Sequence, residues 1–278
     1  MKILGIIGSP RKKKGLTYQV VTKALKGAET KGADTEITYL LDYNPDYCIH
    51  CGYDCFNELR CQQEDKLNRL FKKVENSDGI ILGSPVYIWQ ANALTGIFME
   101  KLRLKTLPWD HSNDNLRSAL GIAVAGGTGT GVFPALKSIY SFFNLWKFNP
   151  LTPLPVTRFN FDKALNLAEK QGVKMGLNKI KNISEPAEIM AVYDDLKYLD
   201  YNRKDEFHWL ASQLLKNLKE DSSLSSNKVA TINNIINSGN KESEKDNPEM
   251  AVSNYMEAYK KAKKIWENKK LNGGKNGE

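Results

Sequence analysis

The sequence has no apolar run long enough to cross a membrane. A transmembrane helix needs about 20 predominantly apolar residues, and no stretch of this chain approaches that length. The first apolar run, in MKILGIIGSPRKKKG, is too short for a secretory signal, and its basic cluster follows the run instead of preceding it. We therefore expect a cytoplasmic protein without a membrane partner.

Histidines and cysteines are also few. The three histidines are too scattered to form a metal-binding pair or a triad, so His50 is expected to be an ordinary loop residue. All four cysteines lie in one stretch, CIHCGYDCFNELRC, residues 48–61. Cytosolic thiols stay reduced, which makes structural disulfides the least favoured interpretation. Four thiolates can instead bind zinc, hold an iron–sulfur cluster or remain empty.

The formal net charge is +8. Such an excess is typical of a solvated lysine-rich surface, and it also suits an acidic partner protein or an anionic cofactor. No module with interleaved basic and aromatic residues is recognisable, so we expect no nucleic-acid partner.

Residues 1–181 alternate short apolar runs with amphipathic segments. Strands are predicted at 2–7, 36–41, 79–83, 119–125 and near 151–157. Helices are predicted at about 17–31, 65–76, 92–104, 132–145 and 163–180. Strands that alternate with helices indicate βαβ units and a parallel sheet. The pattern predicts an α/β fold with a flavodoxin-like, doubly wound, five-stranded parallel sheet.

Residues 182–278 are predicted to form a helical extension. Apolar residues follow helical spacing in 207–218 and 255–266. The polar stretches 220–228 and 238–249 are predicted to be connectors, and LNGGKNGE at the end is predicted to be a disordered tail. The apolar stripes must be covered by the core or by another subunit. We expect a homo-oligomer, either a dimer or a tetramer.

The segment GSPRKKKGLT, residues 8–17, lies where the first predicted strand turns into the first predicted helix. Its glycines permit a tight backbone, Ser9 and Thr17 supply hydroxyls, and Arg11 adds positive charge. A helix N-terminus presents free N–H groups, and the combination favours a phosphate. The segment matches neither G-x-G-x-x-G nor the Walker pattern, so neither a dinucleotide nor ATP is indicated. The alternative is an ordinary polar turn capped by Thr17.

The segment GSPVYIWQANALTG, residues 83–96, follows the third predicted strand. Pro85 stiffens the turn, and Val86, Tyr87 and Trp89 offer apolar surface on which a planar ring can pack. The alternative for the aromatic residues is packing in the core or in an interface.

The segment AGGTGTG, residues 125–131, follows the fourth predicted strand. Its glycines let backbone N–H groups approach a ligand closely. The loops after parallel strands leave from the same edge of the sheet, and such folds bind ligands there at the switch point in strand order. The three loops together predict a phosphorylated, planar ligand.

These segments and the cysteine stretch resemble the iron–sulfur flavoproteins of the flavodoxin-like NADPH-dependent FMN reductase superfamily. The resemblance covers about residues 1–180 and implies FMN as the cofactor. It implies that the phosphate lies on Ser9, Arg11 and Thr17. The flavin ring is implied to lie near Pro85, Val86, Tyr87, Trp89, Gly126, Gly127 and Thr128.

The cysteine spacing is C-x2-C-x3-C-x5-C, whereas the family's motif resembles C-x2-C-x2-C followed by a fourth cysteine. The resemblance implies a [4Fe–4S] cluster close to the flavin, with zinc or no metal as the alternatives. Its ligands would be Cys48, Cys51, Cys55 and Cys61.

The expected function is that of an FMN-dependent oxidoreductase that passes electrons between the cluster, FMN and an external partner. A ferredoxin-like protein or NAD(P)H is the expected donor, and a small molecule is the expected acceptor. One alternative is an NAD(P)H-dependent FMN or quinone reductase without a cluster. Another is a non-catalytic regulator that binds flavin or metal.

Overall fold

The computed structural model describes two units of the chain, Met1–Asp200 and Tyr201–Glu278. Within them, the residues left outside the description are 53–60, 64–65, 103–116, 178–185, 222–223 and 274–278. The boundary expected at 181–182 lies in one of these segments and is therefore outside the described residues.

A parallel sheet forms the centre of the first unit, with strand order β2-β1-β3-β5 followed by β6 and β7. The strands are β1 (Lys2–Ile7), β2 (Asp34–Tyr39), β3 (Gly79–Tyr87), β5 (Ser118–Ala125), β6 (Asn149–Pro150) and β7 (Leu154–Thr157). β6 and β7 pair with successive parts of β5, so together they make one interrupted fifth strand. This order confirms the predicted flavodoxin-like, doubly wound sheet. A short strand, β4 (Gln90–Ala91), pairs antiparallel with β3.

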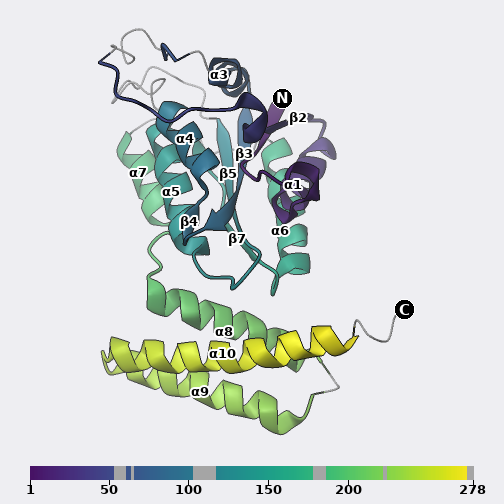
Figure 1. Cartoon of the computed structure of the whole chain (residues 1–278), viewed down its shortest axis with the longest axis vertical. Helices are drawn as coiled ribbons and strands as arrows, with labels where there is room; N and C mark the ends of the chain where they lie inside the picture. The colour runs from purple at the N-terminus through teal and green to yellow at the C-terminus, as the bar shows by residue number, and fades with distance from the viewer. Residues whose placement is uncertain (53–60, 64–65, 103–116, 178–185, 222–223, 274–278) are drawn as a thin grey trace. The chain divides into compact units, whose positions relative to one another are not determined.

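Helices cover both faces of this sheet (Figure 1). α1 and α6 lie on one face, and α4 and α5 lie on the other. All eight residues of β5 are buried, as expected for a strand between two helical layers. The helices of the unit are α1 (Leu16–Glu29), α3 (Leu67–Glu75), α4 (Ala93–Leu102), α5 (Val132–Leu145), α6 (Phe161–Gly176) and α7 (Pro186–Asp194). The 3-10 turns are η1 (Lys12–Lys14) and η2 (Leu40–Tyr43).

Glycines bring α1 and α6 into backbone contact. A Cβ atom added to Gly172 would lie 1.7 Å from the carbonyl oxygen of Ala24, and one added to Gly27 would lie 2.1 Å from that of Glu169. Real Cβ atoms essentially never come this close to another atom, so no side chain fits at either position. The two helices therefore touch along their backbones.

The interruption of the fifth strand is bridged by Tyr140 of α5. Its hydroxyl donates to the carbonyl of Leu151 at 2.7 Å and accepts from the N–H of Gly121 at 3.1 Å. Gly121 lies in β5 between the segments paired with β6 and with β7. Burial of the ring raises the pKa of Tyr140 well above that of an exposed tyrosine. The hydroxyl thus takes the place of a missing strand partner.

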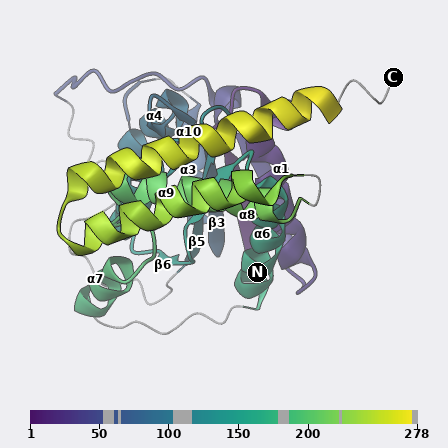
Figure 2. The same ribbon diagram turned by 90° about the horizontal axis from the view of Figure 1, so that it is seen from below.

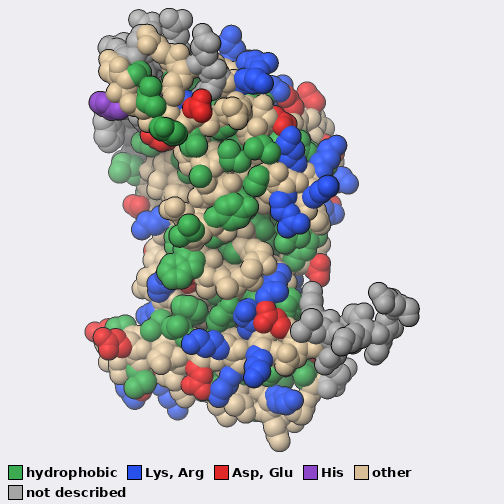
Figure 3. Space-filling model, in the orientation of Figure 1, with side chains coloured by type: hydrophobic (Ala, Val, Ile, Leu, Met, Phe, Trp, Pro, Cys, Tyr) green, Lys and Arg blue, Asp and Glu red, His purple; other side chains and the backbone are tan. Residues whose placement is uncertain are grey.

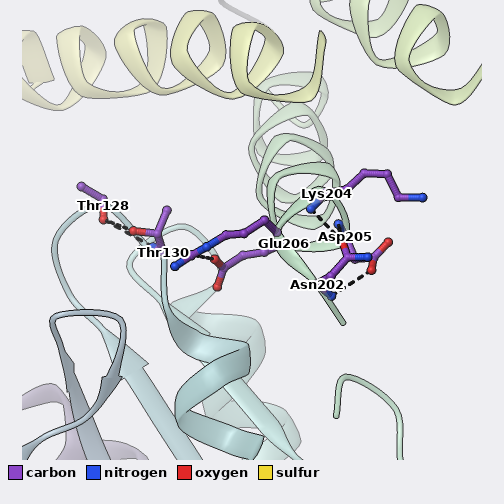
Figure 4. A network of polar contacts seen from close by, with 7 residues as sticks. Thr128, Thr130, Asn202, Lys204, Asp205 and Glu206 are labelled. Atoms are coloured by element: carbon purple, nitrogen blue, oxygen red, sulfur yellow. Dashed lines mark hydrogen bonds and ion pairs between the residues drawn. The ribbon is translucent and has the colours of Figure 1, made fainter. Parts of the chain in front are cut away.

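The second unit consists of helices that pack against one another (Figure 2): α8 (Arg203–Lys219), α9 (Ser226–Glu244) and α10 (Pro248–Gly273). This confirms the predicted helical extension. α8 begins with a capping box (Figure 4). The side chain of Asn202 accepts from the N–H groups of Lys204 and Asp205, and the Asp205 carboxylate accepts from the N–H of Asn202 at 3.0 Å.

The predicted connector 220–228 overlaps a helix only at its last three residues, whereas the predicted connector 238–249 is wrong over most of its length. The helix that replaces most of it is α9, which extends to Glu244. Its polar residues lie on the exposed face, while Ile232, Ile236 and Gly239 are buried. A Cβ added to Gly239 would lie 2.5 Å from the ring of Tyr255 in α10. Three residues of the predicted disordered tail, 271–273, belong to α10, and the remainder lies outside the described residues.

The surface carries charges of both signs. On the face drawn in Figure 3, basic side chains are spread over each unit with acidic side chains among them. In the described part of the chain, no helix is both long and apolar enough to span a membrane.

Candidate cofactor site

The loop after β1 forms a compact turn that ends at the N-terminus of α1. The Ser9 hydroxyl accepts from the N–H of Arg11 at 3.3 Å, and the Ser9 carbonyl accepts from the N–H of Lys12 at 3.1 Å. Ser9 and Thr17 are buried, whereas Arg11 is exposed. The loop therefore places two hydroxyl side chains and one guanidinium group around the start of a helix.

The N-terminus of α1 is open to an anion. Its N-cap residue is Gly15, which supplies no side-chain acceptor, and among the described residues of the first turn there is no acidic side chain. Thr17 is the second residue of the helix and does not cap it, so the alternative of a Thr17-capped turn does not hold. Uncapped N–H groups and the positive end of the helix dipole favour a bound phosphate.

Lys12 connects this loop to the segment after β2. Its ammonium group forms an ion pair with Asp42 of η2 and lies 5.9 Å from the centre of the Tyr39 ring. Asp42 precedes the cysteine stretch by only a few residues. The loop after β1 is thus held against η2, the turn that leads toward the cysteine stretch.

The second predicted loop contains a hairpin followed by the start of α4. β3 continues to Tyr87, so Pro85 and Val86 are strand residues, and the chain turns at Ile88 and Trp89 before it returns as β4. The φ angles of Ile88 and Trp89 are 49° and 61°. A two-residue turn with both φ angles positive is a type I′ hairpin turn, which matches the twist of the flanking strands.

The tip of this hairpin is apolar and exposed. Tyr87 is 48% exposed, Ile88 is 93% exposed and Trp89 is 56% exposed. Positive φ is strained for bulky residues, above all for a β-branched one, and strain of this kind tends to cluster at functional sites. The hairpin therefore presents aromatic surface in a backbone conformation that its own residues disfavour.

The glycine-rich loop after β5 lies against this hairpin. A Cβ added to Gly131, whose φ is 91°, would lie 2.4 Å from the Cα of Trp89 and 2.9 Å from the side chain of Val86. Thr128 and Thr130 share a hydrogen bond between their hydroxyls at 2.7 Å (Figure 4). The second and third predicted segments are therefore in direct contact.

Gly126 and Gly127, in the same loop, have open space beside their backbone. The atom nearest to a Cβ added to Gly126 would be in the side chain of Leu16 at 3.8 Å, which also makes the first loop a neighbour of the third. A Cβ added to Gly127 would meet no described atom within 4 Å. Packing within the protein therefore does not explain these two glycines, whereas a ligand held close to the backbone would.

Asn92, which precedes α4 and caps it, is not among the residues predicted for the site. Its side-chain oxygen accepts from the N–H of Thr95 at 3.3 Å, and its amide group reaches the loop after β1. An asparagine directly before the apolar run ALTGIF is a recognisable capping signal. The contact with the loop after β1 has no such local signal.

Three of the four cysteines are described, and Cys55 lies outside the described residues. Cys48 and Cys61 are half-buried and Cys51 is exposed, and none of these three is in a disulfide. The Cys61 thiol donates to the Gln63 side-chain oxygen at 3.7 Å, and the Gln63 amide donates to the carbonyl of Tyr47, next to Cys48, at 3.1 Å. Within the described residues, no three His, Cys, Asp or Glu side chains are grouped as metal ligands.

The family model for NADPH-dependent FMN reductases matches residues 1–164. Among curated proteins, an iron–sulfur flavoprotein of Methanocaldococcus jannaschii is 35% identical over 145 residues, which cover 51% of this chain and 72% of the relative. An iron–sulfur flavoprotein of Archaeoglobus fulgidus is 34% identical over 131 residues, which cover 47% of this chain and 56% of the relative. A solved NAD(P)H:quinone oxidoreductase from Methanothermobacter marburgensis superposes with a TM-score of 0.52 at 13% identity, over 66% of this chain and 98% of that one.

The structural likeness supports the fold alone, since the sequence identity is low. Together with the strand order, it defines a protein of the flavodoxin-like class. The sequence matches go further: the chain belongs to the NADPH-dependent FMN reductase family, in the branch of the iron–sulfur flavoproteins. The protein is accordingly a flavin-dependent oxidoreductase whose flavin is FMN.

Proposed function

We propose that FMN binds at the carboxyl edge of the sheet, with its phosphate in the loop after β1 and its ring between the β3–β4 hairpin and the loop after β5. The observation that carries the proposal is the uncapped N-terminus of α1, which lies next to the buried residues Ser9 and Thr17. A dianionic phosphate would satisfy the free N–H groups there and interact with the exposed Arg11.

The ring would occupy the space in front of Gly126 and Gly127. Tyr87 and Trp89 expose aromatic surface on the hairpin that touches this loop, and a planar ring packs well on such surface. Pro85 and Val86 lie in the strand that leads to the hairpin, and Thr128 lies in the loop itself. When bound, FMN supplies one- or two-electron transfer, and the protein contributes position and electrostatics.

Cys48, Cys51, Cys55 and Cys61 are proposed to hold a [4Fe–4S] cluster. The relatives are named for an iron–sulfur group, and four closely spaced thiolates are the ligands that such a cluster needs. The bridge through Gln63 already holds Cys61 near the backbone next to Cys48. The ion pair between Lys12 and Asp42 supports a position of the cluster near the proposed phosphate site, because Asp42 lies in the turn that leads into the cysteine stretch.

The protein would then pass electrons between the cluster, FMN and an external partner. A ferredoxin-like protein or NAD(P)H is the proposed donor, a small molecule is the proposed acceptor, and the proposed assembly is a homo-oligomer. The second candidate is an NAD(P)H-dependent FMN or quinone reductase without a cluster. The observation that favours it is that the three described thiols are not grouped as metal ligands.

The phosphate site is tested by comparing FMN with riboflavin, which lacks the phosphate. Thr17→Ala should weaken FMN binding by about tenfold, the effect expected for the loss of one charge-assisted hydrogen bond, and leave riboflavin binding nearly unchanged. Thr22→Ala is the matched control, because the Thr22 hydroxyl lies in the same helix and is buried without a partner among the described residues. Equal losses of affinity for FMN and riboflavin in Thr17→Ala would contradict the proposed position of the phosphate in this loop.

The cluster is tested by metal analysis of protein purified without oxygen. Iron at cluster stoichiometry is expected in the parent. Cys55→Ala should lose that iron, keep FMN, and lose reduction by a one-electron protein donor. Stoichiometric zinc, or flavin without metal, would instead support the reductase without a cluster.

A further inference from the structure

The buried side chain of Asn92 joins the loop after β1 to β3 and α4. Its amide nitrogen donates to the carbonyl of Gly8 at 2.8 Å. Its oxygen accepts from the Thr95 hydroxyl at 2.6 Å and from the Ser84 hydroxyl at 3.2 Å. Asn92 is 3% exposed, and Ser84 and Thr95 are completely buried. The backbone N–H of Asn92 also donates to the Ser84 hydroxyl at 3.2 Å. A buried network of this kind holds its members in one arrangement.

Gly8 has little freedom to leave this arrangement. Its N–H donates to the carbonyl of Gly83 in β3 at 2.8 Å, and a Cβ on Gly8 would lie 2.1 Å from the Thr95 hydroxyl. The carbonyl held by Asn92 belongs to the peptide that joins Gly8 to Ser9. Because a trans peptide is planar, a carbonyl that points toward Asn92 turns the Ser9 N–H in the opposite direction.

We infer that Asn92 is a positioning residue for the FMN phosphate: its amide fixes the Gly8–Ser9 peptide so that Ser9 presents its N–H and hydroxyl to the anion. This inference rests on the proposed function, since it assigns the orientation of a loop proposed to bind the phosphate. Asn92 itself does not touch the cofactor in this assignment. Asn92 acts through its hydrogen bond to Gly8, which lies 84 residues before it in the sequence.

Asn160 provides a matched control. It precedes α6 as Asn92 precedes α4, and it is 8% exposed. Its amide donates to the carbonyl of Pro155 at 3.0 Å, and its oxygen accepts from the N–H and the hydroxyl of Thr157. Asn160 therefore makes the same kinds of hydrogen bond beside the fifth strand, away from the loop after β1.

The test compares Asn92→Asp with Asn160→Asp by measuring dissociation constants for FMN and riboflavin and the free energy of unfolding. Each change replaces an amide donor with a carboxylate oxygen that faces a carbonyl, so both variants should lose stability. Only Asn92→Asp should reduce the preference for FMN over riboflavin, by about tenfold. A loss of stability alone would weaken the binding of FMN and of riboflavin equally and leave that preference unchanged.

A preference that is unchanged in Asn92→Asp, or reduced equally in Asn160→Asp, overturns the inference. Ser84→Ala covers the case in which Asn92→Asp does not fold, because it removes one hydroxyl of the network with little change in volume. It should reduce the preference by about threefold, and an unchanged preference in this variant also overturns the inference. A parent protein that binds riboflavin as tightly as FMN would instead contradict the proposed phosphate site.

Discussion

Gly127→Ala should weaken FMN binding without harming the fold. The added methyl group would meet no described atom within 4 Å, and the φ angle of Gly127 lies outside the left-handed region that favours glycine. Alanine at such a position usually stabilises a protein by about 0.4–1 kcal/mol, because it restricts the unfolded chain. The free energy of unfolding of the apoprotein should therefore stay the same or rise.

The effect on FMN should have the opposite sign. The space in front of Gly127 is the place proposed for the flavin ring, so the methyl group would overlap a bound cofactor. Overpacking by one methyl group costs about 1–3 kcal/mol, which corresponds to roughly 5- to 150-fold in affinity. Riboflavin should lose affinity equally, because it carries the same ring.

The assay is a pair of measurements on each variant: denaturant unfolding of the apoprotein and titration with FMN and riboflavin. Gly96→Ala is the matched control, since Gly96 also has no described atom within 4 Å of an added Cβ and lies in α4, outside the hairpin and the glycine-rich loop between which the ring is proposed to lie. Gly131→Ala should instead lower the free energy of unfolding, because its Cβ would collide with the hairpin. Unchanged flavin affinity in Gly127→Ala would refute the placement of the ring.

Two further predictions concern stability. Tyr140→Phe should lower the free energy of unfolding by about 2 kcal/mol. The change removes the hydroxyl that bonds to the N–H of Gly121 and to the carbonyl of Leu151 at the break in the fifth strand. An effect below about 0.5 kcal/mol in urea unfolding would contradict the bridging role. Hydrogen bonds from Lys73 and, to a smaller extent, from Lys2 hold the pKa of the Glu36 carboxyl below its ordinary value. The ion pairs should therefore stabilise the fold above about pH 4.3 and be lost as the pH falls below it. Between pH 7 and pH 3.5, the parent should lose about 0.5 kcal/mol more stability than Glu36→Gln, and equal losses in the two proteins would contradict this role of the ion pairs.

The sheet could be predicted because its strands are buried on both faces. The runs at 2–7, 79–83 and 119–125 are apolar at nearly every position, and their alternation with helices indicates a parallel sheet. The structure then supplies the strand order. α9 was missed for the opposite reason. Most of its residues are polar, and only Ile232, Ile236 and Gly239 are buried, so its composition resembles that of a connector.

The segments of the candidate site could be found from the sequence, but their contacts could not. Ile88 and Trp89 form a tight turn without the glycine or asparagine that usually marks one, so the hairpin left no local signal. The hydrogen bond from Asn92 to Gly8 joins residues that are 84 positions apart in the chain, so no local pattern encodes it. Cys55 belongs to the predicted cluster motif and lies outside the described residues.

The backbone contact between α1 and α6 has a consequence for the entropy of cofactor binding. With Gly27 and Gly172 packed this close to carbonyl groups of the facing helix, α1 has little room to rotate or slide against α6. The N–H groups at its first turn are thus oriented before any anion arrives. A binding group that is already ordered loses little conformational freedom when its ligand associates, so more of the interaction energy remains as affinity.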